Sequence, residues 1–226
     1  MDGRVTEEYT GLVRNSEGLW YVENGMIHWN HTGLVSSAEG WFYVMDGRVT
    51  EEYTGLVRND AGLWYVAGVK LDETHTDLVS SMEGWFYVMN GRVTEEYTGL
   101  VRNSEGLWYV ANGKLDDTYT NLVNSVEGWF YAMNGRVTEE YTGLVTNENG
   151  NWYVDKGVVS LTHEGLICDA TGWWYVVESH VAEDYTGLAT NDAGTWYVQN
   201  GYLDFGFSGE IRVGGDTYNV VGGLVQ

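Results

Sequence analysis

The sequence predicts an all-β fold, an elongated β-hairpin solenoid of about ten 22-residue repeats, and three observations support it. The segment GRVTEEYTGLV occurs four times unchanged, beginning at Gly3, Gly47, Gly91 and Gly135. A weaker copy lies between these segments, and no insertion or deletion breaks the resulting 22-residue period. The chain has 31 glycines and no proline, and no window shows sustained helical periodicity. A constant period without gaps gives each repeat an equivalent place in a one-dimensional stack.

Each repeat is predicted to form short strands joined by tight turns. In the first full repeat, the apolar pair Leu12-Val13 is followed by a turn at residues 15–18. Residues 19–22 form an aromatic and β-branched run that is typical of a strand. Asn24-Gly25 then predicts a two-residue type I′ hairpin turn, because this turn needs positive φ at both positions. Met26-Ile27 is the returning strand.

Two aromatic columns follow the period, and we expect their rings to bury against neighbouring repeats because an isolated hairpin is marginal in water. One column begins at Trp20 and the next at Tyr21. Residues 1–204 are predicted to be tandem repeats, and residues 205–226, where the pattern decays, a divergent capping repeat. The chain opens in mid-repeat, so we expect it to be a segment of a longer protein.

Odd and even repeats differ in a regular way. Odd repeats read GLWYV and carry an arginine in the turn, whereas even repeats read GWFYV and are followed by a Glu pair. The arginines are Arg14, Arg58 and Arg102, and the pairs are Glu51 with Glu52, Glu95 with Glu96, and Glu139 with Glu140. The alternation is either the relic of a 44-residue duplication or a sign that successive repeats have different surroundings, and both interpretations stay open.

Composition excludes several classes of function. The chain has 33 acidic and 11 basic residues, a formal net charge of −22, which disfavours nucleic acid as a partner. No apolar run is long enough for a transmembrane helix, so membrane insertion is not expected. The Glu pairs predict a solvated acidic face, since neighbouring residues of an extended segment point to opposite sides. We expect no metal site, no cofactor and no catalytic residue, and Cys168 has no neighbouring base in the sequence.

His31, His75 and His163 occupy the column that elsewhere holds tyrosines such as Tyr53 and Tyr97. The exchange of His with Tyr indicates a planar stacking position and not a metal ligand. His28 lies close to His31 in the sequence, but a third ligand is not evident.

Several motifs resemble the choline-binding and glucan-binding cell-wall repeats of Gram-positive bacteria. The matching segments are Gly11-Leu12, residues 18–22, residues 25–27 and Thr32-Gly33, in the family's order and near-equal spacing. The resemblance covers nearly the whole chain. It implies a β-hairpin solenoid on a bacterial surface protein, with aromatic pockets between repeats that hold a choline headgroup or a glycan.

One column departs from the family pattern. The family's cage uses the Trp of its Gly-Trp pair, whereas this sequence has Leu in that column in nine repeats, from Leu12 to Leu188. A quaternary ammonium needs aromatic faces on several sides, so a choline cage is disfavoured. The candidate ligand-binding residues are the second aromatic wall, the substitute tryptophans of the even repeats and three tyrosines beside them: Trp20, Trp64 and Trp108; Trp41, Trp85, Trp129 and Trp173; Tyr43, Tyr87 and Tyr131.

The sequence therefore predicts a non-catalytic extracellular module of a bacterial cell surface, which binds cell-wall polymer or glycan through repeated shallow aromatic sites. Repetition would raise avidity through effective concentration. The negative charge favours a neutral sugar over an anionic polymer. The alternative is a structural stalk or spacer without a small ligand, with possible head-to-tail self-association through an unpaired strand edge.

Overall fold

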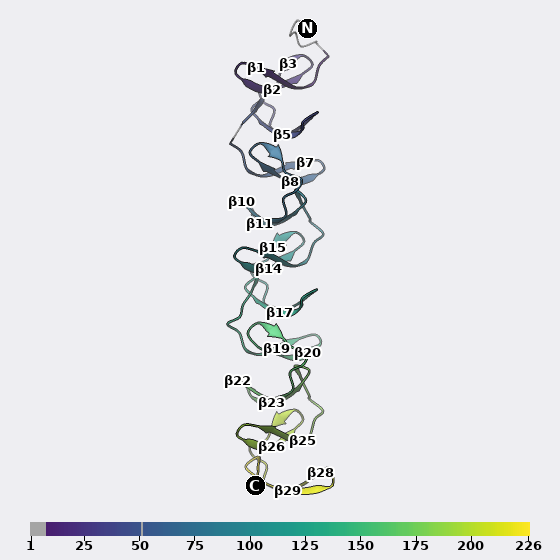
Figure 1. Cartoon of the computed structure of the whole chain (residues 1–226), viewed down its shortest axis with the longest axis vertical. Coiled ribbons are helices and arrows are strands. Elements are labelled where there is room, and N and C mark those ends of the chain that lie inside the picture. The colour runs from purple at the N-terminus through teal and green to yellow at the C-terminus, as the bar shows by residue number, and fades with distance from the viewer. Residues whose placement is uncertain (1–7, 51) are drawn as a thin grey trace. The chain divides into compact units, whose positions relative to one another are not determined.

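The computed structural model describes residues 8–50 and 52–226. Within them the chain forms thirty strands, and strand is their only regular secondary structure. The chain divides into two compact units, Met1–Asp116 and Asp117–Gln226, both built from the same hairpin repeat (Figure 1). The described residues contain no helix long and apolar enough to cross a membrane.

Each repeat contains three strands. The first strands are β1 (Gly11–Asn15), β4 (Gly33–Ser37), β7 (Gly55–Asn59), β10 (Asp77–Ser81), β13 (Gly99–Asn103), β16 (Asn121–Ser125), β19 (Gly143–Asn147), β22 (Gly165–Asp169), β25 (Gly187–Asn191) and β28 (Gly209–Val213). The second strands are β2 (Gly18–Glu23), β5 (Gly40–Met45), β8 (Gly62–Ala67), β11 (Gly84–Met89), β14 (Gly106–Ala111), β17 (Gly128–Met133), β20 (Gly150–Val154), β23 (Gly172–Val177), β26 (Gly194–Gln199) and β29 (Asp216–Val221). The two-residue third strands are β3 (Met26–Ile27), β6 (Arg48–Val49), β9 (Lys70–Leu71), β12 (Arg92–Val93), β15 (Lys114–Leu115), β18 (Arg136–Val137), β21 (Val158–Val159), β24 (His180–Val181), β27 (Tyr202–Leu203) and β30 (Leu224–Val225).

Two tight turns shape every hairpin. Strands β1 and β2 pair antiparallel from Gly11 opposite Val22 to Asn15 opposite Gly18, and the other repeats keep this register. The second turn has the positive φ values predicted for Asn-Gly, 49° at Asn24 and 78° at Gly25. At the equivalent Gly47, a Cβ atom would lie 2.7 Å from the carbonyl oxygen of His28, so the preceding segment leaves no room for a side chain.

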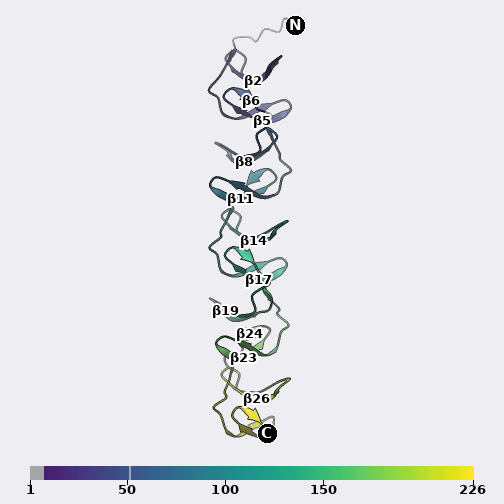
Figure 2. The same ribbon diagram turned by 90° about the vertical axis from the view of Figure 1, so that its left-hand side faces the viewer.

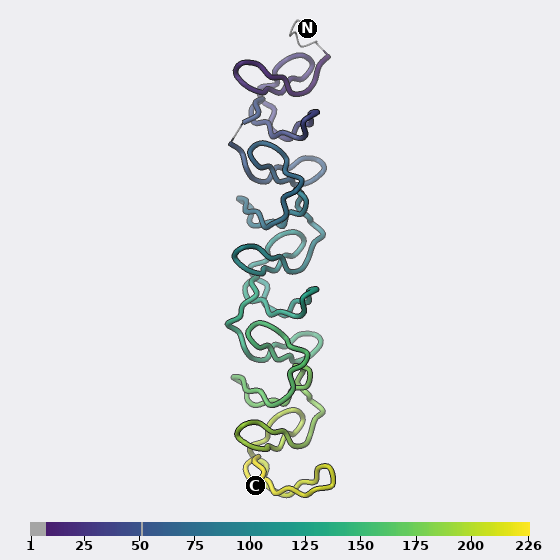
Figure 3. The backbone as a smooth tube through the Cα atoms, viewed as in Figure 1, coloured from purple at the N-terminus to yellow at the C-terminus, as the bar shows by residue number. Residues whose placement is uncertain are grey.

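The third strand joins successive hairpins within the first unit. Strand β6 pairs with β5 of its own repeat and also with β2 of the preceding repeat, where Arg48 lies opposite Trp20 (Figure 2). The backbone amide of Tyr21 donates to the carbonyl of Gly47 at 2.9 Å, and that of Tyr43 donates to Val69 at 2.7 Å. The same looped path therefore recurs from one hairpin to the next (Figure 3).

The second unit uses the same connection between its hairpins. Phe130 lies opposite Val158, Trp152 opposite His180, Trp174 opposite Tyr202 and Trp196 opposite Leu224. The chain segment 205–226 retains the three strands of a full repeat, β28 to β30, despite its divergent sequence. The predicted all-β hairpin solenoid of about ten repeats is confirmed, since ten such hairpins are present in the described residues.

In each unit the core is built around one small, fully buried side chain in most repeats. Nine repeats bury one residue to 0 % exposure, at Val44, Val66, Val88, Val110, Ala132, Val154, Val176, Val198 and Val220. Leu34 and Tyr43 of one hairpin pack with Val57 and Val66 of the next, so the Gly-Leu column belongs to the core. A fully buried valine contributes about 2 kcal/mol, which explains why one hairpin needs its neighbours.

Candidate binding sites

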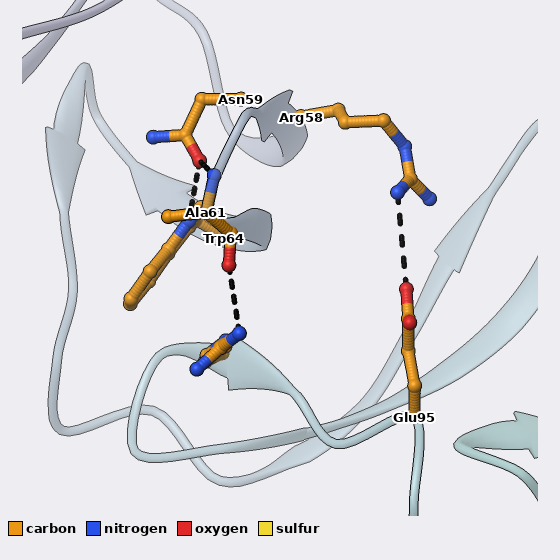
Figure 4. A network of polar contacts seen from close by, with 6 residues as sticks. Arg58, Asn59, Ala61, Trp64 and Glu95 are labelled. Atoms are coloured by element: carbon orange, nitrogen blue, oxygen red, sulfur yellow. Dashed lines mark hydrogen bonds and ion pairs between the residues drawn. The ribbon is translucent and has the colours of Figure 1, made fainter.

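The tryptophans of the second aromatic wall are held by the turn of their own hairpin. The Nε1 atom of Trp64 donates to Oδ1 of Asn59 at 3.0 Å, and the same oxygen accepts the amide of Ala61 at 2.9 Å (Figure 4). Trp20 and Trp108 make the same bond to Asn15 and Asn103, at 3.1 and 3.0 Å. The indole NH groups are therefore occupied within the chain, and the sequence prediction did not include these asparagines.

Cations of the chain itself cover this aromatic column in the first unit. The guanidinium of Arg48 lies 5.3 Å from the ring centre of Trp20, and that of Arg92 lies 5.3 Å from Trp64. The ammonium groups of Lys70 and Lys114 lie 4.7 and 5.5 Å from Phe42 and Phe86. These distances are within the range of cation–π attraction. Each cation comes 28 residues after its ring, a constant spacing that could have revealed the pairing from sequence.

The two arginines are also anchored by hydrogen bonds. The Nη2 atom of Arg48 donates to the carbonyl of Glu17 at 2.6 Å, and that of Arg92 donates to Ala61 at 2.7 Å. Each arginine thus contacts both the ring and the turn of the preceding hairpin.

In the second unit, other residue types stand 28 positions after the ring. His180 lies 4.7 Å from Trp152 and Tyr202 lies 5.0 Å from Trp174, measured between ring centres and both in edge-on geometry.

The substitute tryptophans of the even repeats have a range of exposure. Trp41 and Trp85 are 40 % and 44 % exposed, and Met45 and Met89 on the same strands are exposed too. Trp129 and Trp173 are half-buried, and Trp129 packs against the cluster that contains Tyr131. Trp41 and Trp85 are therefore the most accessible rings among the predicted site residues.

The three candidate tyrosines lie in the stack between hairpins. Tyr43 and Tyr131 are buried and Tyr87 is half-buried. Their rings lie 4.2, 4.3 and 4.7 Å from those of Tyr53, Tyr141 and Tyr97, in that order. The predicted stacking role of the histidine column is confirmed in the same way, because His31, His75 and His163 lie 4.1, 3.9 and 4.6 Å from Tyr21, Tyr65 and Tyr153.

Titration behaviour in this stack follows burial. Burial raises the pKa of Tyr53, Tyr97 and Tyr141, with a smaller contribution from the facing tyrosine. Burial, together with a hydrogen bond to Glu164, raises the pKa of Tyr175 to about 12. Burial lowers the pKa of His31, with a further lowering by His28 and an opposing effect of Glu23.

The acidic positions face solvent. Glu52, Glu95 and Glu96 are exposed, as are Glu139 and Glu140, whereas Glu51 lies outside the described residues. Among the described residues, no group of three or more His, Cys, Asp or Glu side chains is placed to hold a metal ion. Arg58 and Glu95 form an exposed ion pair, with 3.8 Å between Nη1 and Oε1 (Figure 4).

One exposed aromatic was not among the predicted site residues. Trp29 is 59 % exposed and lies edge-on to Trp20, with 5.2 Å between ring centres. It occupies a column that is Glu73 and Glu95 in later repeats. This exchange of an acid for an aromatic ring is the sequence signal that could have revealed it.

Grooves lie between hairpins of the first unit and recur every 44 residues. A groove of about 740 Å³ is lined by Arg14, Leu19 and Thr50, and its equivalent of about 510 Å³ is lined by Arg58 and Leu63. A second pair, of about 360 and 510 Å³, flanks the same two leucines on the side of Ser36 and Ser80. Each of these four grooves includes Leu19 or Leu63, and none of them is lined by Trp41 or Trp85.

A family model for the choline-binding repeat matches more than half of the chain, at residues 8–28, 30–50, 75–94, 96–116, 140–160, 164–179 and 184–204. The chain belongs to the choline-binding repeat family. The predicted resemblance is thereby confirmed, and the seven matched segments are choline-binding repeats in which leucine replaces the tryptophan of the Gly-Trp pair. No curated protein matches the sequence.

Several solved structures are similar to these choline-binding repeats. CbpJ from Streptococcus pneumoniae TIGR4 is 12 % identical, with 96 % of this chain and 94 % of that chain covered and a TM-score of 0.34. Choline binding protein F from Streptococcus pneumoniae, in the presence of a peptidoglycan analogue, is 13 % identical over 96 % and 93 %, with a TM-score of 0.35. Alternansucrase in complex with isomaltononaose is 14 % identical, with 96 % of this chain and 16 % of that chain covered and a TM-score of 0.34. These scores are low, so the family assignment rests on the repeat model alone.

Proposed function

We propose that this chain is a non-catalytic, extracellular module of a bacterial cell surface that binds a neutral cell-wall glycan through repeated shallow aromatic faces. The observation that carries the proposal is the exposure of Trp41 and Trp85, 40 % and 44 %, at equivalent places in two even repeats. A flat, half-exposed indole offers the apolar surface on which one face of a sugar ring can pack.

A quaternary ammonium is a less suitable ligand for the first unit. Arg48 and Arg92 already lie over Trp20 and Trp64, and Lys70 lies over Phe42. An external cation would have to displace a side chain that is bonded to the neighbouring turn, as Arg92 is to Ala61. The net charge of −22 also disfavours an anionic wall polymer, so a neutral sugar is favoured.

Binding of the wild-type chain to purified cell-wall glycan and to isomalto-oligosaccharides, measured by calorimetry, tests the proposal. Replacing both rings, Trp41→Ala with Trp85→Ala, is expected to weaken binding about fivefold at each site, since loss of an aromatic contact of roughly 1 kcal/mol changes Kd by that factor. Val126→Ala is the matched control, because Val126 is fully exposed at the equivalent turn of a later repeat. Unchanged affinity of the double variant would show that Trp41 and Trp85 do not bind the glycan.

A structural stalk or spacer is the second candidate, and one observation favours it. Most rings of the two columns already have a partner in the chain, such as Asn59 and Arg92 for Trp64 or Tyr53 for Tyr43. Such a stalk would bind no glycan, and it could associate with further copies of itself. Absence of binding to every wall and glycan preparation, together with concentration-dependent self-association in sedimentation, would favour the stalk.

A further inference from the structure

The column that holds Leu19 and Leu63 in odd repeats holds Trp41 and Trp85 in even repeats. Leucine fills less space than tryptophan, and the four grooves described above all lie beside one of the two leucines. In these two odd repeats, leucine in place of tryptophan leaves open space beside the hairpin. The volumes of the four grooves, about 360 to 740 Å³, are typical of sites for small ligands.

Each leucine has an arginine beside it that borders two grooves. Arg14 lines both grooves at Leu19, and Arg58 lines both grooves at Leu63. The side chains of Arg58 and Glu95, 61 % and 66 % exposed, face each other at 3.8 Å. An ion pair this exposed stabilises the fold by only about 0–1 kcal/mol, so both groups can exchange this contact for a ligand without a large loss of stability.

These polar groups match the hydrogen-bonding pattern of a sugar. The guanidinium of Arg58 offers only donors and the carboxylate of Glu95 only acceptors, whereas each sugar hydroxyl both donates and accepts. Apolar side chains such as Val49 and Phe42 line the groove at Leu19 and suit the carbon face of the ring.

The charges in the grooves nearly cancel, in contrast to the net charge of the chain. At Leu63, Arg58 and Arg92 stand against Asp60, Glu95 and Glu96. The field of the whole chain repels anions, and the local arginines oppose the entry of a cation. A neutral ligand with many hydroxyl groups is therefore the best chemical match.

We propose that the grooves at Leu19 and Leu63 are binding sites for a neutral, polyhydroxylated saccharide, with Arg14 and Arg58 as the polar contacts. The inference rests on the proposed glycan function and adds a class of site separate from the exposed tryptophans. It also gives the 44-residue alternation a role, since it sets the spacing between equivalent sugar sites along the first unit.

The test fills the grooves with the side chain that the chain itself uses in even repeats. Leu19→Trp with Leu63→Trp is compared with Trp41→Ala with Trp85→Ala, and the Kd for isomaltononaose and for purified wall glycan is measured by calorimetry. We expect the groove-filling variant to raise the Kd at least tenfold, whether or not the alanine variant also weakens binding. If the groove-filling variant binds as tightly as the wild type while the alanine variant binds more weakly, the grooves are not saccharide sites, and the proposed glycan-binding function is retained. If the wild-type chain binds neither probe, both proposals fail.

A second variant keeps the inference testable if the new tryptophans disturb folding. Arg14→Gln with Arg58→Gln keeps the groove open and removes both guanidinium groups. We expect an unchanged midpoint of urea unfolding and a Kd raised at least fivefold. Arg212→Gln is the matched control, since it removes an exposed arginine from the last repeat. Wild-type affinity of the Arg14 and Arg58 variant would overturn the assignment of the arginines to the site.

Discussion

The stacking column contains one position that a single substitution should improve. In the repeats with tyrosine, the hydroxyl donates to the leucine carbonyl three residues later, as in Tyr53 to Leu56 at 2.9 Å and Tyr97 to Leu100 at 2.6 Å. His31 stacks on Tyr21 like these tyrosines, but its Nε2 atom is buried and has no hydrogen-bond partner. The change His31→Tyr would replace this atom by a bonded hydroxyl.

The magnitude follows from the contacts. A buried polar atom without a partner costs about 1–3 kcal/mol, and a new hydrogen bond adds about 1 kcal/mol. His31 is itself only half-buried, so we expect less than the sum of these two terms, about 1–2 kcal/mol. The pocket has room for the tyrosine hydroxyl. A Cβ atom built on Gly33 would lie 3.9 Å from Nε2 of His31, whereas a Cβ atom built on the equivalent Gly55 would lie 3.3 Å from the hydroxyl of Tyr53. For a chain of this length the gain corresponds to a rise in Tm of about 2–8 °C.

Urea unfolding at pH 7.5, followed by circular dichroism, measures the gain. Amide hydrogen exchange of residues 33–45 locates it, since stability in repeat proteins is a sum of local terms. Tyr53→Phe is the matched control, because it removes only a hydroxyl, and we expect it to lose about 1 kcal/mol. If Tyr53→Phe is destabilising while His31→Tyr gives no gain, the explanation of the column by this hydrogen bond is wrong.

Three further results are expected. The folded-state pKa of His31 is lowered, so the unfolded chain binds the proton first as the pH falls below about 6.5, and the wild type loses stability. The urea midpoint should therefore decrease more between pH 7.5 and pH 5 for the wild type than for His31→Tyr. Equal decreases for the two chains would contradict this. Gly201→Ala should lower the free energy of unfolding by about 2 kcal/mol or more, because the new Cβ would lie 2.7 Å from the carbonyl oxygen of Ala182 at a φ of 74°. Gly214→Ala, at a φ of 61° with no atom within 4 Å of the new Cβ, should be less destabilising. Thermal unfolding of both variants compares the two losses. Arg92→Met should lose about 1–2 kcal/mol of unfolding free energy, through the contact with Trp64 and the bond to Ala61. Arg14→Met, at an exposed position of β1, is the comparison, and equal losses for the two variants would show that those contacts are unimportant.

The repeated features of the fold could be predicted from the sequence because each one recurs at the same spacing. The Asn-Gly pairs predicted the positive φ values at Asn24 and Gly25, and the period predicted the common register of the hairpins. The exchange of histidine and tyrosine predicted the ring stack that His75 forms with Tyr65. Each of these inferences needed only residues within one repeat or the next.

The contacts between repeats were harder to predict. Strand β6 pairs with β2 of the preceding repeat, and this pairing brings Arg48 over Trp20, which no local turn rule reveals. The grooves were also missed, because leucine at positions 19 and 63 reads as ordinary core. Open space is a property of both facing hairpins and follows only from their packing.

The hydrogen bonds join residues that are close in sequence, and this determines how the chain would respond to a pulling force. Among the bonds described, the longest in sequence joins Asn151 and Glu183, 32 residues apart. The bonds that join successive hairpins therefore close loops of similar length, at a similar cost in entropy. A pulled chain would release its hairpins singly, in steps of nearly equal length, and each could re-form on its neighbour once the force is relaxed. Opening of one hairpin would therefore leave the remaining repeats folded.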